Sequence, residues 1–214
     1  MVRRLLTVLV LVVAGLVGSS ATACAETYSA RLTRAISDLP VAREVRTGYS
    51  RDLFPHWTDV DGDGCSTRNE VLISEADDPV TTSGTCTITQ GRWYSYYDRV
   101  SWTDPSDVDI DHMVPLAEAW DSGARSWSTS TRRAFANDLG DYRTLVGVTD
   151  NVNQSKGDQD PATWLPRYDT CRYLREFVAV KLRWRLRIDS AEKREMSSLA
   201  SSCTNSTITV TRAR

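Results

Sequence analysis

Two short stretches of the chain hold residue types that together can do hydrolytic chemistry. The first, DIDHMVP, spans residues 109–115 and places a histidine, His112, directly after a carboxylate. The second, NQSKGD, spans residues 153–158 and holds an amide and an ammonium group. Imidazole takes up a proton near neutral pH, and carboxylate and amide oxygens bind hard cations. A base beside oxygen ligands is what a metal-assisted hydrolase needs, so we predict one site formed by both stretches.

A short strand is expected to carry the first stretch. Residues 108–111 alternate β-branched side chains with carboxylates, the pattern of a strand with two unlike faces, and Pro115 ends strand pairing. Asp109 and Asp111 then share one face, about 7 Å apart at the rise of a strand. His112 would point to the opposite face. Asp111 and His112 can therefore serve one site only if the chain bends between His112 and Pro115.

The second stretch is expected on a helix that follows a second strand. Residues 143–148 have the composition of a strand, and Thr149 or Asp150 can cap the helix. Asn153 and Lys156 are three residues apart and so lie on one helical face. Two strands and a helix would thus bring a carboxylate, an imidazole, an amide and an ammonium group together.

The remaining segments predict helices and one hairpin, which makes the expected fold class α+β. Strands at residues 85–90 and 92–97 would form the hairpin around Gly91. The polar tail, residues 204–214, is expected to be mobile. Further helices are expected early in residues 26–50, where Pro40 ends the helix, and at residues 116–122, 128–139, 170–186 and 190–202, the last two forming a C-terminal pair over 170–202.

Residues 1–23 have the features of a secretory signal peptide. Two arginines precede an apolar run at residues 5–17, and Ala21-Thr22-Ala23 resembles a cleavage site. The apolar run is short for a membrane span, which disfavours the alternative of a membrane anchor. The mature chain, residues 24–214, has a length that suits a single domain.

Cys24 leaves two outcomes open. Cleavage before Cys24, with lipid on its sulfur, would give a lipoprotein on the outer face of the cell membrane, although residues 20–23 lack the usual leucine of such a site. Cleavage after Ala25 would remove Cys24, and the protein would be secreted. Both outcomes place the domain in an oxidising compartment.

The other four cysteines form an even set, which predicts two disulfides. Three pairings are open, and locality favours Cys65–Cys86 and Cys171–Cys203. The sequence has no Cys-x-x-Cys spacing, which disfavours a metal bound by cysteine.

The acidic balance of the mature chain fits poorly with one class of partner. Without Arg3 and Arg4, the chain holds 24 basic and 28 acidic residues, a net charge of −4. A nucleic-acid binder usually has a basic excess, so binding of that kind would need a local basic cluster. Arg132 and Arg133, on the expected helix at 128–139, are candidate phosphate contacts and could equally be solvated helix charges.

An acidic segment matches the calcium-loop pattern D-x-D-x-D-G-x5-E in full. Asp59, Asp61, Asp63 and Glu70 would supply oxygens to a structural Ca²⁺. The alternative is an acidic turn held by a disulfide, because Cys65 occupies a ligand position and no clear helix precedes the loop.

The other histidine of the chain, His56, lies between Pro55 and Trp57 in an aromatic-rich segment. No partner motif accompanies it, so we interpret His56 as a surface or structural residue and not a catalytic one.

The order of these motifs resembles the ββα-metal finger of HNH nucleases. A strand ends in Asp-His, a second strand follows, and a helix offers Asn-x-x-Lys, over residues 108–166. The longer segments DIDHMVPLAEAW, RRAFANDL and NQSKGDQDPATWLP, with the acidic DGDGCSTR, resemble secreted bacterial HNH family endonucleases over nearly the whole mature chain. The resemblance implies a single nuclease domain built on that finger.

The resemblance assigns a role to each residue that matches its motif. It implies that His112 is the general base, and that Asp111 and Asn153 bind the metal. Lys156 matches a basic position near the phosphate, and Asn137 resembles the residue that braces the finger loop and orients the histidine. Asn153 stands where many members have a second histidine, and oxygen ligands favour one Mg²⁺ or Mn²⁺ over Zn²⁺.

Asp109 is expected to steady the metal ligands. The implied function is a secreted endonuclease that uses one divalent cation to hydrolyse DNA, and in a broader reading RNA, to 5′-phosphate and 3′-hydroxyl ends. The implied partner is the nucleic-acid substrate, with no protein partner. Two alternatives stay open: an extracellular Ca²⁺-binding or adhesion module without catalysis, and a metal-dependent hydrolase of another phosphodiester or of cell-wall material.

Overall fold

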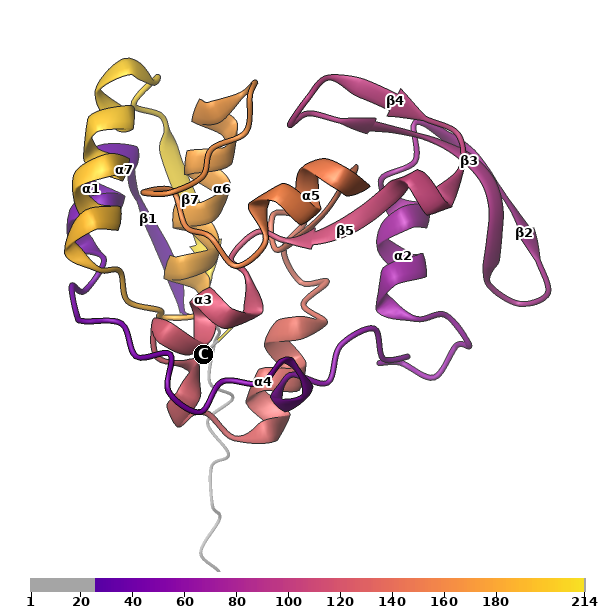
Figure 1. Ribbon diagram of the computed structural model, residues 1–214, viewed down its shortest axis with the longest axis horizontal. Helices are drawn as coiled ribbons and strands as arrows, with labels where there is room; N and C mark the ends of the chain where they lie inside the picture. Colours follow the sequence, from indigo (N-terminus) through magenta and orange to yellow (C-terminus); the bar gives the residue numbers. More distant parts are fainter. Residues whose placement is uncertain (1–25, 214) are drawn as a thin grey trace, which may run out of the picture.

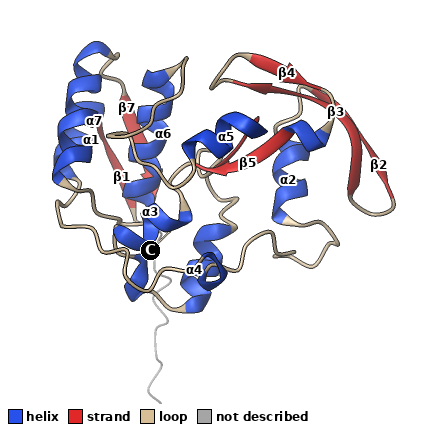
Figure 2. Cartoon of the chain, in the orientation of Figure 1, coloured by secondary structure: helices blue, strands red, loops and turns tan. Residues whose placement is uncertain are grey.

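Short strands and helices alternate along residues 26–213, the part of the chain that a computed structural model describes (Figure 1, Figure 2). The expected signal peptide, residues 1–23, and Cys24 lie outside this part. The mixture of elements confirms the α+β class.

The strands are Thr27–Arg31 (β1), Asp78–Ser83 (β2), Thr87–Ser95 (β3), Val100–Trp102 (β4), Val108–His112 (β5), Leu145–Thr149 (β6) and Thr207–Thr211 (β7). The helices are Leu32–Asp38 (α1), Thr67–Ser74 (α2), Leu116–Asp121 (α3), Thr129–Ala136 (α4), Asp150–Lys156 (α5), Thr170–Arg183 (α6) and Ser190–Ser202 (α7), with 3₁₀ turns at Arg51–Leu53 (η1), Pro105–Asp107 (η2) and Ala124–Ser126 (η3).

Strand β5 lies between the two sides of the fold (Figure 1) and pairs antiparallel with β6. Their register runs without a break from Val108 opposite Thr149 to His112 opposite Leu145. Every residue of β6 is buried, which explains why its sequence is nearly all apolar and does not alternate. Helix α5 follows β6 directly and packs against both strands. The first sequence stretch therefore begins on β5, and most of the second lies on α5.

The larger hydrophobic core surrounds α6, on the side of the fold that holds α1, α7 and the β1–β7 pair (Figure 1). Tyr173, Leu174 and Phe177 recur at helical spacing along α6 and are fully buried. Truncation of such a buried aromatic to alanine typically costs about 3–5 kcal/mol. On the other side, β2, β3 and β4 form an antiparallel sheet beside α2.

Both predicted disulfides are confirmed. Cys65–Cys86 joins the segment before α2 to the start of β3, and Cys171–Cys203 joins the start of α6 to the end of α7. They close separations of 21 and 32 residues. Loops of this length correspond to about 3 kcal/mol of stabilisation each in the chain-entropy description.

The C-terminal tail is ordered, contrary to the prediction of a mobile segment. Thr207–Thr211 forms β7, which pairs antiparallel with β1, so that Thr211 lies opposite Thr27. Ile208 and Val210 alternate with threonines and are buried against the α6 core. The composition of the tail is polar, but its period-2 pattern is that of a strand with one buried face.

The predicted hairpin around Gly91 is also wrong. Residues 87–95 form one continuous strand, and the preceding turn contains Gly84, whose φ is +63°. Gly91 is required inside the strand because the indole of Trp93 lies 2.4 Å from where a Cβ would be. Glycine in a strand can mark close approach of another group as well as a turn.

The N-terminal helix is shorter than expected. Residues 27–31 form β1, and the helix that the apolar spacing predicts begins at Leu32 and ends at Asp38. Leu32 and Ile36 are buried as that spacing requires. Within residues 26–213, no helix has the length and apolar character needed to cross a membrane.

Candidate active site along strand β5

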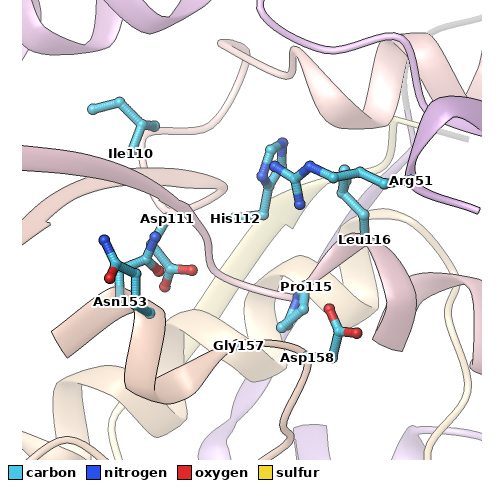
Figure 3. A pocket seen from close by; sticks show the side chains of 10 residues that line it. Arg51, Ile110, Asp111, His112, Pro115, Leu116, Asn153, Gly157 and Asp158 are labelled. Atoms are coloured by element: carbon cyan, nitrogen blue, oxygen red, sulfur yellow. The ribbon is translucent and has the colours of Figure 1, made fainter. Parts of the chain in front are cut away.

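A cavity of about 170 Å³ brings the two sequence stretches together (Figure 3). It is lined by part of β5, the segment that leads into α3, the C-terminal part of α5 and one residue of η1. The lining residues are Arg51, Ile110, Asp111, His112, Pro115, Leu116, Asn153, Gln154, Gly157 and Asp158.

Three consecutive residues of β5, from Ile110 to His112, line this cavity. Neighbours on a strand point to opposite faces, so a cavity over one face would contact only alternate residues. The cavity is therefore not confined to one face of β5. The predicted bend is present, because the chain bends at Met113 and Val114, directly after the last paired residue of β5. Strand β5 stays in register through His112, and the N–H of Met113 still donates to the carbonyl of Thr144 at 3.0 Å.

Asp111 is bound by a fully buried lysine. Its Oδ2 accepts from Lys156 Nζ at 2.5 Å and from the Tyr97 hydroxyl at 2.6 Å. Lys156 Nζ also donates to the carbonyls of His112 and Met113, each at 3.0 Å. Lys156 is 0% exposed. The structure thus contradicts the expectation that Lys156 lies at the phosphate, and makes it a positioning residue for Asp111.

The Asp111–Lys156 pair is ionised, although burial opposes both charges. Burial raises the pKa of Asp111 and lowers the pKa of Lys156. Three acceptors surround Nζ, however, and only an ammonium group has three protons to donate. Oδ2 of Asp111 accepts from two donors, as a carboxylate does. Its other oxygen, Oδ1, accepts no hydrogen bond from residues 26–213 and is left for a ligand.

His112 is held in one tautomer. Its Nε2 lies 2.9 Å from the carbonyl oxygen of Ala136, the last residue of α4. A carbonyl only accepts, so Nε2 carries the proton and Nδ1 keeps a lone pair. Burial, aided by the nearby charge of Arg51, lowers the pKa of His112 to about 3. The imidazole is therefore neutral at neutral pH, with Nδ1 as the nitrogen that can take a proton.

His56 and Trp57 lie against His112, which the sequence does not indicate. The ring centroids of Trp57 and His112 are 5.0 Å apart at an interplanar angle of 30°, and those of His56 and His112 are 6.4 Å apart. His56 is held by a hydrogen bond of 2.8 Å between Nδ1 and the carbonyl of Phe54. Trp57 has a φ of +55°, a conformation that costs roughly 1–3 kcal/mol in a non-glycine residue. The interpretation of His56 as a surface or structural residue stays a prediction, and the structure places this residue against the His112 ring.

Asn137 fastens the loop that carries these two aromatic rings. Its Oδ1 accepts from the N–H of Thr58 at 2.9 Å, and its Nδ2 donates to the carbonyls of Pro55 and Arg133, each at 2.7 Å. Asn137 follows Ala136 directly and does not line the cavity. These contacts suit a residue that braces the loop. They also suit one that holds the neighbouring Ala136 carbonyl, which accepts from His112, and this is the kind of role that the resemblance implies.

Asp109 orients Asn153. Nδ2 of Asn153 lies 3.2 Å from Oδ2 of Asp109. A carboxylate only accepts, so the amide nitrogen faces Asp109 and the amide oxygen is left as a ligand. Figure 3 shows Asn153 beside Asp111. Through this contact Asp109 can perform the role expected of it, which is to steady a metal ligand.

Two further charged residues line the cavity and were missed in the sequence. Figure 3 shows the guanidinium group of Arg51, an exposed residue of η1, beside the His112 ring. About sixty residues separate Arg51 from His112 along the chain, so no local pattern connects them. Asp158 ends the NQSKGD stretch and accepts from Arg46 Nη1 at 3.1 Å. Its position at the end of the NQSKGD motif is the sequence signal that could have identified Asp158 as a site residue.

The two candidate phosphate contacts on α4 are not part of the cavity. Arg132 is buried and donates to the carbonyls of Leu53 and Trp127 and to the Thr129 hydroxyl. These bonds use its guanidinium group inside the protein, so the phosphate prediction for Arg132 is wrong. Arg133 is exposed and lies 3.4 Å from the Thr58 hydroxyl, outside the cavity.

The calcium-loop residues lie close together on the surface. One carboxylate oxygen from each of Asp59, Asp61 and Asp63 lies within 4.8 Å of the other two. Glu70, at the start of α2, has a buried Oε2 without a hydrogen-bond partner. Partial burial and the three aspartates raise the pKa of Glu70. Ca²⁺ binding by this loop stays a prediction.

The oxygens available in the cavity suit a hard divalent cation. Within the described part of the chain, Oδ1 of Asp111 and the amide oxygen of Asn153 take part in no hydrogen bond, and both residues line the cavity. Mg²⁺ and Mn²⁺ prefer such ligands and keep several waters. Asp111 and Asn153 therefore fit the metal-binding part that the resemblance implies.

Comparison with known proteins supplies the family. Residues 67–199 match the family described as GmrSD restriction endonucleases, C-terminal domain. The chain belongs to this family. The matched range contains every residue that lines the cavity except Arg51. A nuclease family implies a nucleic-acid substrate and suggests a requirement for a divalent metal.

One curated relative is similar over most of both chains. It is an "Uncharacterized secreted protein" of the fungus Arthroderma benhamiae, 49% identical over 158 residues, which cover 73% of this chain and 76% of the relative. Because this relative is fungal, the comparisons do not support restricting the resemblance to bacteria. No solved structure matches the chain.

Proposed function

We propose that the protein is a secreted HNH-type endonuclease in which Nδ1 of His112 removes a proton from the water that attacks a phosphodiester bond. The observation that carries this proposal is the orientation of His112. Its Nε2–H is fixed on the carbonyl of Ala136, and its Nδ1 is left free in a residue that lines the cavity. Two oxygen ligands lie in the same cavity, and the family is one of nucleases.

His112 is suited to act as a base despite its low pKa in the free protein. No proton has to leave Nδ1 before the reaction, because burial keeps the ring neutral. An anionic phosphate bound beside the ring raises the pKa of His112, so the base strengthens when substrate is present. The Ala136 carbonyl then stabilises the imidazolium ion that forms.

Arg51 is proposed to contact the phosphate. Arg51 lines the cavity and is exposed. Lys156 and Arg132, by contrast, are buried. A guanidinium group can donate two parallel hydrogen bonds to phosphate oxygens and favours the extra negative charge of the transition state.

Asp111 and Asn153 are proposed to bind one Mg²⁺ or Mn²⁺. When bound, such an ion would polarise the phosphate and stabilise negative charge on the leaving oxygen. Asp109 fixes the amide of Asn153, and Lys156 fixes the carboxylate of Asp111. Lys156 also offsets the charge of Asp111, which lets this carboxylate stay ionised in a buried position.

The local fold supports the assignment to the ββα-metal class. Two antiparallel strands, β5 and β6, are followed directly by α5, and the base and the two metal ligands come from β5 and α5. The expected products are 5′-phosphate and 3′-hydroxyl ends of DNA, with RNA as a second substrate. The name of the fungal relative, a secreted protein, and the predicted signal peptide support secretion; a lipid on Cys24 is the alternative anchor.

The test is nicking of a supercoiled plasmid by the mature protein with Mg²⁺ or Mn²⁺. We expect the wild type to nick and His112→Ala to lose about 100- to 10,000-fold in rate, the usual contribution of a general base. Arg34→Ala, an exposed substitution on α1 outside the cavity, is the matched control and should keep its activity. Equal nicking by the wild type and His112→Ala, or none by the wild type, would refute the proposal.

A further inference from the structure

Three arginines line a second cavity, at the surface where α6 packs beside β7 (Figure 1). Arg172 and Arg175 come from α6, and Arg143 comes from the segment before β6. The cavity has a volume of about 350 Å³ and shares no lining residue with the active-site cavity. Its lining also includes the hydroxyl groups of Ser206 and Thr207. Guanidinium and hydroxyl groups donate hydrogen bonds, so these residues suit an anion.

The acids of this region are more buried than the arginines that they pair with. Glu176 accepts from Arg172 Nε at 2.8 Å, and its side chain is 6% exposed against 44% for Arg172. Glu176 also accepts from the Tyr96 hydroxyl at 2.6 Å. Asp141 accepts from two nitrogens of Arg143, at 2.8 and 2.6 Å. Both carboxylates are therefore bound inside the protein, and the charge that faces the solvent belongs to the arginines.

Two of these guanidinium groups keep unused donors. Arg175 is partly exposed and takes part in no hydrogen bond or ion pair within residues 26–213. Arg172 donates through Nε alone in the same part of the chain, so both of its terminal nitrogens are left for a ligand. Its guanidinium carbon lies 3.9 Å from the centroid of the Tyr96 ring, which holds the group in place. A guanidinium fork matches the spacing of two phosphate oxygens.

The outer face of the β1–β7 pair continues from this cavity. Thr207 lies opposite Arg31, and Thr209 lies opposite Ser29. Residues paired in this way project from the same face, and all four are exposed. The outward positions of both strands hold threonine, serine and arginine, with no acid among them. Phosphate groups of nucleic acids are bound by side chains of these types.

We propose that this surface binds the phosphate backbone of the nucleic-acid substrate, outside the cleavage site. This arginine face consists of Arg31, Arg143, Arg172 and Arg175. The inference rests on the proposed function, because it places the part of the substrate that the active site does not hold. Charge complementarity supports a polyanion: the mature chain is acidic overall, so nucleic-acid binding needs a local basic cluster of this kind. Tyr142, 72% exposed beside Arg143, adds a ring on which a base can stack.

The experiment is a fluorescence-anisotropy titration of a labelled DNA duplex of about 30 base pairs with the mature protein, in EDTA so that binding is measured without cleavage. One phosphate contact contributes about −0.9 to the slope of log K against log salt concentration, which is roughly 8-fold in affinity at about 0.1 M salt. We expect Arg175→Ala to raise the Kd roughly 8-fold under these conditions. Arg31→Ala/Arg175→Ala should reduce the magnitude of the slope by about 2.

Arg194→Ala is the matched control. Arg194 is an exposed arginine of α7 that likewise has no hydrogen bond or ion pair within residues 26–213, and it does not line the cavity. Its replacement should leave the Kd and the salt slope unchanged. Thermal unfolding of each variant checks that the fold is intact, which we expect because Arg175 holds no other group of the described chain.

An unchanged Kd and slope in the double variant would overturn the inference. So would a wild type that binds no DNA, or one that binds anionic phospholipid vesicles in place of DNA, which would assign the face to a membrane surface. Plasmid nicking is a separate readout. A wild type that binds DNA through these arginines without nicking it refutes the proposed function and supports the arginine face, whereas nicking with unaltered affinity in the variants refutes the arginine face alone.

Discussion

Replacement of Lys156 by methionine tests the buried charge pair beside the active site. The change keeps an unbranched apolar stem but removes the ammonium group that contacts Asp111. Asp111, only 4% exposed, would keep one donor, the Tyr97 hydroxyl. Breaking a buried pair by removing one partner costs about 3–5 kcal/mol, because the remaining charge is left uncompensated. The carbonyls of His112 and Met113 lose a donor as well.

We therefore expect Lys156→Met to lower the free energy of unfolding by about 4 kcal/mol at pH 7.5. Urea unfolding followed by circular dichroism measures this difference. The double variant Asp111→Asn/Lys156→Met leaves no unpaired charge and should lose only about 1–2 kcal/mol. Lys193→Met is the matched control, because this partly exposed lysine of α7 donates to one carbonyl, that of Ser37.

The pH dependence of Lys156→Met has a definite sign. Without the ammonium group, burial leaves the pKa of Asp111 in the folded variant above its value in the unfolded chain. A group of this kind stabilises the fold at low pH, and that contribution is lost as the pH rises through the folded pKa. The deficit should thus be smaller at pH 5 than at pH 7.5. A loss of unfolding free energy below about 1 kcal/mol in Lys156→Met at pH 7.5 would refute the ionised pair. So would a loss in the double variant as large as that in Lys156→Met.

Three further predictions concern catalysis and metal binding. We expect the kcat/KM of the wild type to stay flat between pH 5 and 8, because burial holds the pKa of His112 at about 3; a fall with a midpoint near 6.5 would contradict this. Arg51→Ala should lower kcat/KM about 100-fold with no loss of thermal stability, since Arg51 is exposed, and an unchanged rate would remove it from the phosphate site. Millimolar Ca²⁺ should raise the Tm of the wild type by more than that of Glu70→Gln, and equal rises would exclude Glu70 as a ligand.

Local patterns were sufficient to predict the elements that carry the site. The alternation at residues 108–111 predicted β5, and the Asn-x-x-Lys spacing placed Asn153 on a helix, now α5. Both disulfides followed from the cysteine count and their separation in the chain. Such features depend on neighbouring residues, so the sequence carries them without reference to the rest of the fold.

Local patterns failed where the partner of a segment lies far away in the chain. The 204–214 tail has a polar composition, but β1, some 180 residues earlier, gives Thr207–Thr211 a strand to pair with. Gly91 is typical of a turn by residue type, but the Trp93 ring packed against it is what requires a glycine inside β3. Arg51 and His56 reach His112 only through the path of the segment after α1.

The sequence by itself determined which residues could form the site: a histidine behind a carboxylate, and an amide and a lysine on one helical face. The tertiary structure decided how they divide the work. Asn153 and Lys156 share a helix, yet Asn153 reaches the cavity while Lys156 is buried beneath Asp111. The physical reason is that helical spacing sets the relative direction of two side chains, whereas the packing of α5 on β5 and β6 sets their depth. The amide of Asn153 can thus meet a substrate or an ion in the cavity, whereas the buried ammonium group of Lys156 can only hold Asp111.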